Sequence, residues 1–231
     1  MNTKEESRTS YFHYFDYGVQ GYIDSVLIRI RKEVFNFFMR KFSPNENETV
    51  LDVGVSADDH IAANYFEKHY PYTSKITAVS NESFPELEQQ FKGLTFKKAD
   101  GRKLPFEDGF FDWVYSHAVV EHVGSNTMQQ AFVDELVRVA RKGVLYTTPN
   151  RWHPIETHTG LPFLHFLPAL IYRPIFKALG KDMYATEEQL NLLSIDQMQK
   201  LSKNAKGRKS SEIETVKWFG FTSNIVSIIY K

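Results

Sequence analysis

Cysteine is absent from this chain of 231 residues. Disulfide bonds, cysteine-ligated zinc, iron–sulfur clusters and thiol nucleophiles are therefore excluded, and the composition suits a reducing compartment. An excess of charge of either sign is also absent, since 28 Lys and Arg residues balance 28 Asp and Glu residues. This balance argues against a uniformly basic surface, so we expect no nucleic-acid partner.

Long apolar stretches are missing as well. No run approaches the ~18 apolar residues that a membrane-spanning helix needs. The opening residues MNTKEESRTS are polar and carry both charges, unlike a secretory signal peptide. We therefore expect a cytoplasmic protein without a transmembrane segment. Aromatic residues are abundant instead, at 15% of the chain, which indicates an aromatic core or a pocket for an apolar or planar ligand.

The pattern of apolar residues predicts strands that alternate with helices. Short β-rich runs lie at 49–53, 75–79, 94–98, 111–116 and 144–147. Helical periodicity covers 21–43, 62–69, 84–91, 127–141 and 194–205. Gly143 is predicted to stop the fourth of these helices. Two more strands, 213–218 and 224–230, are separated by a short loop and predict a terminal hairpin.

Strands and helices in this order are typical of βαβ units and of a parallel sheet covered on both faces. We expect an α/β three-layer sandwich with a seven-stranded, mostly parallel sheet whose last strand runs antiparallel. A single domain should span residues 1–231, with an N-terminal helical arm at 1–45 and an insertion at about 150–190 that covers the substrate. The arm contains the aromatic cluster YFHYFDY at 11–17, and the insertion contains LPFLHFLPALIYRPIF at 161–176. This second run predicts a lid helix packed on the core; the alternative is an apolar wall for a substrate or a contact with a membrane surface.

The residues that follow the predicted strands carry the main indication of function. In an open parallel sheet, ligands bind beyond the carboxyl ends of the strands. Here those ends are polar, acidic and rich in histidine: DVGVSADD, SNES, ADGRKLPF, SHAVVEHVG and TPNRWHPIETH. No metal site is predicted, because His117 and His122 are five residues apart, which does not suit two ligands on one helix face.

Three stretches add a more specific indication: TVLDVGVS, KADGRKLPFEDGFFDWVYSHAVVEHVG and RVARKGVLYTTPN. They resemble the class I S-adenosylmethionine-dependent methyltransferases, close to the small-molecule branch (methyltransferase type 11) of ubiquinone-biosynthesis-like enzymes. The resemblance covers about residues 45–150. It implies the Rossmann-like form of the predicted fold and S-adenosyl-L-methionine as the cofactor.

The resemblance also implies roles for individual residues. The positions that match the family's cofactor site are Asp52, Gly54, Asp100, Gly101, Ser116 and His117. The first two would surround the methionine part of the cofactor. Asp100 and the backbone of Gly101 would meet the adenine, and the last two would lie near the sulfonium.

Two positions depart from the family pattern. The first loop, D-V-G-V-S-A-D, keeps one glycine, Gly54, and has Ser56 and Asp58 where the family has two more. After the second strand, Ser80 stands where an acid usually binds the ribose hydroxyls. Glu82, two residues later, is the nearest carboxylate and is expected to take part.

The methyl acceptor is expected beside the segments after the fourth and fifth strands. Candidate catalytic residues there are Glu121, His122 and His153, and candidate substrate-binding residues are Asn150, Arg151, Trp152 and His158. A histidine with an unperturbed pKa of about 6.5 is largely neutral at cellular pH and can accept a proton from a hydroxyl or an amine. We expect O- or N-methylation of a small molecule, for which a saccharide or a lipid-linked intermediate is preferred.

Other interpretations remain open at this point. Asp52 can cap a helix, Asp100 can serve a turn, and an isolated histidine is often only a hydrogen-bonded core residue. The missing glycines also permit a non-catalytic, methyltransferase-like scaffold or binding protein. An NAD-type or nucleotide-sugar enzyme would need a glycine-rich first turn, which is absent. The sequence does not indicate an oligomeric state.

Overall fold

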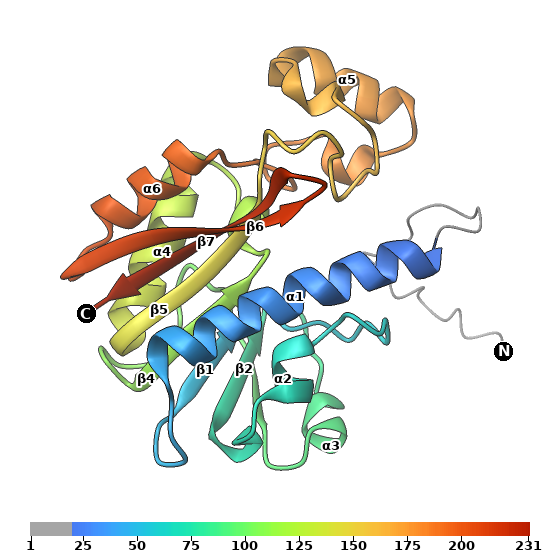
Figure 1. Ribbon diagram of the computed structural model, residues 1–231. Coiled ribbons are helices and arrows are strands. Elements are labelled where there is room, and N and C mark those ends of the chain that lie inside the picture. The colour runs from blue at the N-terminus through green and yellow to red at the C-terminus, as the bar shows by residue number, and fades with distance from the viewer. Residues whose placement is uncertain (1–19) are drawn as a thin grey trace, which may run out of the picture.

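The computed structural model describes residues 20–231, so the aromatic cluster of the predicted N-terminal arm lies outside the described residues. A single sheet forms the centre of the molecule, with the strand order β3-β2-β1-β4-β5-β7-β6 (Figure 1). Its strands are β1 (Val50–Val53), β2 (Ile76–Ser80), β3 (Thr95–Lys98), β4 (Phe111–His117), β5 (Ala140–Pro149), β6 (Ser210–Trp218) and β7 (Phe221–Tyr230).

The directions of the strands confirm the predicted topology. Strands β1 to β5 pair in parallel, whereas β7 runs antiparallel to both of its neighbours, β5 and β6. The β6–β7 hairpin turns through Phe219 and Gly220, whose φ angles are both positive, at 49° and 80°. Two left-handed residues suit the right-handed twist of the strands, which explains the tight turn. The protein has the Rossmann-like α/β fold that the sequence predicts.

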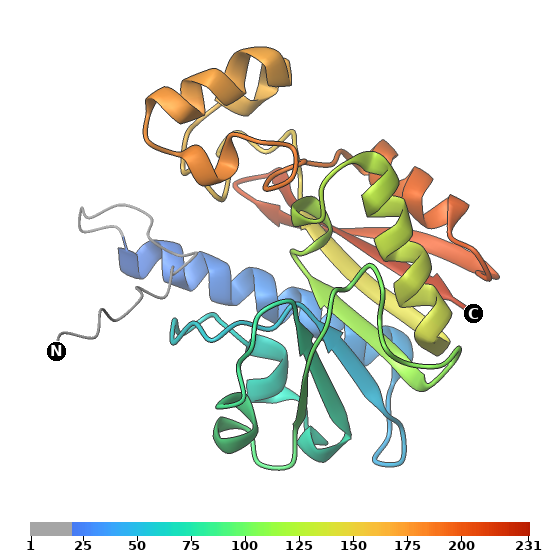
Figure 2. The ribbon, with the colours of Figure 1, turned by 180° about the vertical axis from the view of Figure 1, so that it is seen from behind.

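Helices cover both faces of the sheet (Figures 1 and 2). One face packs against α1 (Gln20–Phe42), α2 (Tyr65–His69) and α3 (Leu87–Gln90), and the other against α4 (Asn126–Val139) and α6 (Ile195–Asn204). Successive side chains of a strand point to opposite faces. Val50 therefore joins the core under α1, while its neighbour Leu51 joins the core under α4.

Much of the aromatic content forms the core between α1 and the sheet. The Phe38 ring makes edge-on contacts with Phe42, Phe66, Tyr70 and Tyr115, at centroid distances of 5.2, 5.0, 6.3 and 5.7 Å. Edge-to-face packing at such distances stabilises aromatic clusters beyond the burial of their area. For these residues, the high aromatic content therefore reflects an aromatic core rather than a pocket for a ligand.

Gly143 does not stop a helix, contrary to the sequence prediction. Helix α4 ends at Val139, and Gly143 lies within β5, where it pairs with Tyr230. A Cβ atom at Gly143 would lie 2.8 Å from the Ile229 carbonyl oxygen and 3.1 Å from the Phe42 ring. The glycine is thus required where α1 packs against the strand. In the sequence, the polar Arg141 and Lys142 extend the helical pattern, so the start of the strand at Ala140 was not recognised.

The segment between β5 and α6 differs from the predicted lid helix. Its helix, α5 (Ala169–Ala178), begins only after Pro168, and a short 3₁₀ turn precedes it at Leu164–Phe166. The segment has a small core of its own, formed by Tyr172, Phe176, Leu190 and Leu192. In Figure 1, α5 stands beyond the end of the sheet at which β5 terminates. In the described part of the chain, no helix is both long and apolar enough to span a bilayer.

Candidate functional site

A strained turn follows β4 and positions the first candidate residues. Ala118 has a φ of 55°, an unusual value for a residue with a side chain. Its N–H donates to the carbonyl of Thr147 at 3.1 Å, which holds the chain in this conformation. A 3₁₀ turn, η2 (Val120–His122), comes next and presents Glu121 and His122. Strain of this kind is often kept at functional sites.

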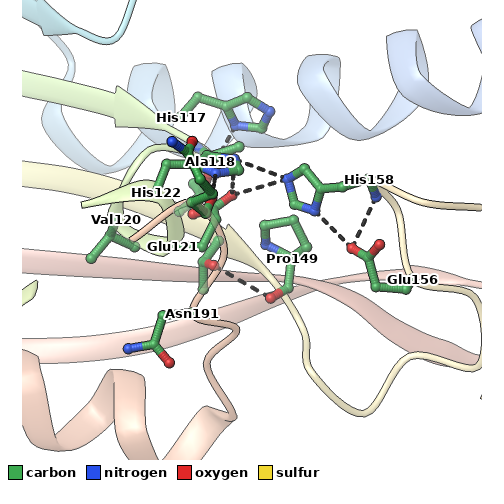
Figure 3. A network of polar contacts seen from close by, with 12 residues as sticks. His117, Ala118, Val120, Glu121, His122, Pro149, Glu156, His158 and Asn191 are labelled. Carbon is green, nitrogen blue, oxygen red and sulfur yellow. Dashed lines mark hydrogen bonds and ion pairs between the residues drawn. The ribbon is translucent and has the colours of Figure 1, made fainter. Parts of the chain in front are cut away.

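His158 joins these two residues from the loop after β5 (Figure 3). The Nε2 atoms of His122 and His158 are 3.1 Å apart. The Glu121 Oε1 atom lies 3.9 Å from the Nε2 of His158 and 4.0 Å from that of His122. We call these three residues the EHH cluster. The structure brings them together although 36 residues separate the two histidines in the sequence.

The opposite ring nitrogens of both histidines are fixed by hydrogen bonds. His158 Nδ1 lies 2.7 Å from Glu156 Oε1, and His122 Nδ1 lies 2.6 Å from the carbonyl oxygen of Gln189. A carbonyl or carboxylate oxygen only accepts hydrogen bonds, so both Nδ1 atoms donate. The Nε2 atoms are therefore the ones aimed into the cluster, as Figure 3 shows.

Burial and mutual charge set the protonation of the cluster. Burial raises the pKa of Glu121 to about 7, and burial lowers the pKa of His122 to about 4, with the neighbouring His158 acting in the same direction. Burial also works to lower the pKa of His158, but the Glu156 carboxylate outweighs it and the net pKa is raised. The pKa of Glu156 falls to about 2, because His158 outweighs the cost of burying that carboxylate. His122 is thus a neutral imidazole at cellular pH.

Sequence reasoning overlooked Glu156, which orients His158. The available signal was the spacing of Glu156 and His158 in the segment TPNRWHPIETH. The main chain N–H groups of His158 and Thr159 also donate to the Glu156 carboxylate, at 2.9 and 2.6 Å. The local turn therefore holds the acid beside the imidazole.

Ser116 and His117 of β4 are tied to neighbouring strands rather than to the EHH cluster. The Ser116 hydroxyl donates to the carbonyl of Val53 at 2.8 Å and is buried. His117 Nδ1 lies 2.8 Å from the Thr147 hydroxyl, and burial holds the pKa of its imidazole well below the usual value. His117 is therefore neutral, and its place near the sulfonium stays a prediction.

The loop after β1 needs its single glycine. Gly54 has a φ of 114°, and a Cβ there would lie 2.1 Å from a methyl group of Val119. Its N–H donates to the carbonyl of Val79 at 2.8 Å. Ser56 and Asp58 replace the other family glycines without strain, because neither is among the described residues with positive φ. The departure from the family pattern is thus compatible with the backbone of this loop.

Asp52 lies within β1 and is buried against Glu67 of α2, so it does not cap a helix. Burial raises the pKa of the Asp52 carboxyl well above its usual value, and the adjacent Glu67 acts in the same direction. Burial also raises the pKa of Glu67. Two carboxyl groups in contact share a proton most readily, so this pair carries less than two negative charges.

We expect Glu67→Gln to flatten the dependence of stability on pH. A carboxyl whose pKa is raised in the folded state favours folding at low pH, and this contribution is lost as the pH rises through the folded pKa. The unfolding free energy of the natural protein should therefore fall more between pH 5 and pH 8 than that of the variant. Urea unfolding at both pH values measures the difference. The exposed Glu46→Gln is the control, and equal slopes for the natural protein and Glu67→Gln would contradict the expectation.

Asp100 and Gly101 follow β3. The Arg102 guanidinium holds the Asp100 carboxylate: its Nε donates to Oδ1 at 3.0 Å and to Oδ2 at 3.1 Å, and its Nη2 donates to Oδ2 at 2.7 Å. The Arg102 guanidinium keeps the pKa of Asp100 below its usual value, so the group is a carboxylate. A Cβ at Gly101 would lie 2.6 Å from the Phe132 ring, which shows how closely this loop approaches α4.

Ser80 and Glu82 follow β2. The Ser80 carbonyl accepts a hydrogen bond from Ala99 at 2.8 Å, and its hydroxyl is buried. Glu82 is exposed, and within residues 20–231 its carboxylate has no hydrogen-bond or ion-pair partner. Of the two candidates for the ribose hydroxyls, Glu82 is the one with free acceptor atoms.

The remaining predicted residues lie after β5 and divide into two groups. His158 belongs to the EHH cluster, whereas His153 stacks on Trp218 at 5.1 Å and is buried with its Nδ1 against the backbone of Ile155. Asn150 uses its amide to hold the turn, donating to Thr222 at 3.0 Å. Trp152 is half exposed, with the Arg151 guanidinium 5.4 Å from its ring.

Comparisons with known proteins agree with the resemblance in the sequence. Residues 51–147 match the model of the methyltransferase domain family. The fold is similar to that of magnesium protoporphyrin IX methyltransferase from Synechocystis PCC 6803, solved with bound SAH, at 13% identity and a TM-score of 0.57, over 96% of this chain and 90% of that chain.

Two archaeal structures show the same likeness. A SAM-dependent methyltransferase from Methanosarcina mazei has 15% identity and a TM-score of 0.51, over 84% of this chain and 96% of that chain. A protein from Pyrococcus horikoshii OT3 has 16% identity and a TM-score of 0.55, over 87% of this chain and 90% of that chain.

Two findings together indicate a class I methyltransferase domain. They are the match over residues 51–147 and the Rossmann-like sheet with its loops at the carboxyl edge. The chain accordingly carries a methyltransferase domain over residues 51–147, and this match supports S-adenosyl-L-methionine as its cofactor.

Proposed function

We propose that this enzyme methylates an oxygen or a nitrogen of a small molecule that binds beside the EHH cluster. The observation that carries the proposal is the position of the cluster, with Glu121 and His122 after β4 and His158 in the loop after β5. In open α/β sheets this edge is where ligands bind, next to the loops that receive the cofactor. The neutral His122 supports the role of proton acceptor.

The residues present fit the cofactor. Glu82 offers free carboxylate oxygens for the two ribose hydroxyls, and Asp100 is an ionised acceptor for the adenine amino group. The bare backbone of Gly54, which no other residue can replace without a clash, lets the first loop pass close to a ligand. When bound, the cofactor supplies a methyl group activated by a positive sulfur.

The protein's part in the reaction is alignment and proton removal. Transfer from a sulfonium is an in-line displacement, so holding the acceptor in position supplies much of the rate. His122 would take the acceptor's proton on Nε2, with its Nδ1–H fixed on the Gln189 carbonyl. Trp152 and Arg151, at the start of the covering segment, would contact the acceptor by stacking and hydrogen bonding, as suits a saccharide or a lipid-linked intermediate. We place the reaction in the cytoplasm, in line with the absence of cysteine.

The assay that tests this function measures SAH formed from S-adenosyl-L-methionine in the presence of hydroxyl- and amine-bearing small molecules. We expect turnover with at least one such acceptor and none with RNA or DNA. A folded protein that binds the cofactor but methylates only nucleic acid or protein would overturn the proposed acceptor class.

Cofactor affinity provides a separate prediction. We expect Asp100→Ala to weaken the binding of S-adenosyl-L-methionine by roughly tenfold to over a hundredfold, because a hydrogen bond to a charged acceptor contributes about 1–3 kcal/mol. Isothermal titration calorimetry measures the change. Arg102→Ala is the informative control, since it removes the present partner of Asp100 and leaves the carboxylate in place. Equal affinities for the natural protein and Asp100→Ala would show that adenine is held elsewhere.

A further inference from the structure

Within residues 20–231, the EHH cluster lacks a hydrogen-bond donor or a cation to pair with its buried carboxylate. Glu121 is fully buried, and among the described residues neither of its carboxylate oxygens has a hydrogen-bond partner. Leaving a buried carboxylate unpaired is costly, so such a group normally faces a donor or a cation. The two histidine Nε2 atoms lie 3.9 and 4.0 Å from its Oε1.

The two histidines also require a positive species at the centre of the cluster. Each Nδ1 carries a hydrogen, because each faces an oxygen that only accepts. In neutral rings, both Nε2 atoms then present bare lone pairs to each other at 3.1 Å. Two lone pairs at that distance repel unless a positive species lies between them. Either a proton or a metal ion can fill this role.

We propose that Glu121, His122 and His158 bind a divalent transition-metal ion such as Zn²⁺. Two imidazole nitrogens and one carboxylate are a ligand set found in zinc sites that keep a coordination position open. Zinc bonds to such atoms are about 2.0–2.2 Å long, so neighbouring ligands at a tetrahedral angle lie roughly 3.3 Å apart. The histidines already meet this spacing, and the carboxylate needs to approach by less than about 1 Å.

The surroundings match those of metal-binding histidines. Such a histidine commonly donates its other ring N–H to a carboxylate or a backbone carbonyl, which fixes the ring and strengthens the ligand. Here Glu156 has this position for His158 and the Gln189 carbonyl has it for His122. Magnesium prefers an all-oxygen site, so the two imidazoles select against it.

Metal binding goes beyond the proposed methyl transfer and does not depend on it. His122 cannot donate its Nε2 lone pair to the metal and to a proton at once, so the bound ion would replace its role as a base. The side chain of His122 is the most exposed of the three, at 28%, which places the open side of the ion next to it. An acceptor hydroxyl bound there would lose its proton more easily, as metal-bound water does.

The test is calorimetric titration of chelator-treated protein with Zn²⁺, without cofactor or acceptor, so that its result is independent of the proposed function. We expect one ion per chain, at least a hundredfold weaker binding in His158→Ala, and about 10–100-fold weaker binding in Glu156→Gln. Mg²⁺ should not bind at this site. His69→Ala removes an exposed histidine outside the cluster and controls for binding to the surface.

Co²⁺ gives a second readout that does not rely on affinity. Its visible absorption should show a coordination number below six in the natural protein, and this signal should disappear in His158→Ala. Circular dichroism confirms that each variant is folded. The proposal fails if Zn²⁺ does not bind, or if it binds the natural protein and folded Glu156→Gln and His158→Ala equally. A proton between the histidines then accounts for their short contact.

Discussion

His122→Ala is expected to lower the rate of methyl transfer by about 10²–10⁴-fold, the usual contribution of a general base. The expectation rests on the neutral imidazole, whose Nδ1–H is fixed on the Gln189 carbonyl and whose Nε2, next to His158, carries the lone pair that accepts a proton. The affinity for S-adenosyl-L-methionine should be nearly unchanged, since we propose His122 as a residue of the acceptor site rather than of the cofactor site. Turnover and calorimetric cofactor binding measure the two quantities separately.

A comparison variant strengthens this test. His153→Ala removes the second candidate base, which the structure shows stacked on Trp218 and buried. We expect it to affect the rate less than His122→Ala does. If both substitutions leave the rate within about threefold of the natural enzyme, transfer relies on alignment alone. If His122 is a metal ligand, its replacement still lowers the rate, but the loss is accompanied by loss of the ion.

Phe38→Ala is expected to lower the free energy of unfolding by about 3–5 kcal/mol, the usual cost of truncating a fully buried phenylalanine. Its ring lies among four aromatic neighbours between α1 and the sheet, and no nearby chain can collapse into the space without disturbing them. The adjacent Phe37 is partly exposed and is covered on one side by Arg40. Phe37→Ala makes the same chemical change in the same helix, so it is the matched control.

Urea unfolding of the two variants measures the difference. The loss in Phe38→Ala should exceed that in Phe37→Ala by at least twofold. Equal losses would mean that α1 contributes to stability through its helix propensity rather than through the buried aromatic cluster.

The sequence predicted the sheet well because its inner strands contain short apolar runs bounded by polar residues. Val50 and Leu51 show why: a strand buried on both faces favours apolar side chains on both, and Asp52 is the buried polar exception in β1. Gly143 was misplaced because the same glycine can end a helix or admit a close neighbour, and only the contact with Phe42 decides between these uses. Helix α5 was predicted too long, since Pro162 and Pro168 interrupt the apolar run.

The candidate site was predicted less completely. The edge of the sheet on which it lies follows from the topology, and His122 and His158 were both identified as candidates. Their contact was not predicted, because it depends on how the chain folds back after β5. Spacing within one element, which was applied to His117 and His122, carries no information about a pair formed from two loops.

The small separate core of Tyr172, Phe176, Leu190 and Leu192 has a consequence for how often the site is assembled. A segment whose apolar contacts are mostly its own can open as a unit while the sheet stays folded. Such opening would carry away His158 and the Gln189 carbonyl, and it would leave Glu121 and His122 in place after β4. The fraction of molecules with an assembled site is then set by a local equilibrium of this segment rather than by the stability of the whole fold. Amide hydrogen exchange in residues 150–193, slowed by any ligand that bridges the two parts, would report that equilibrium directly.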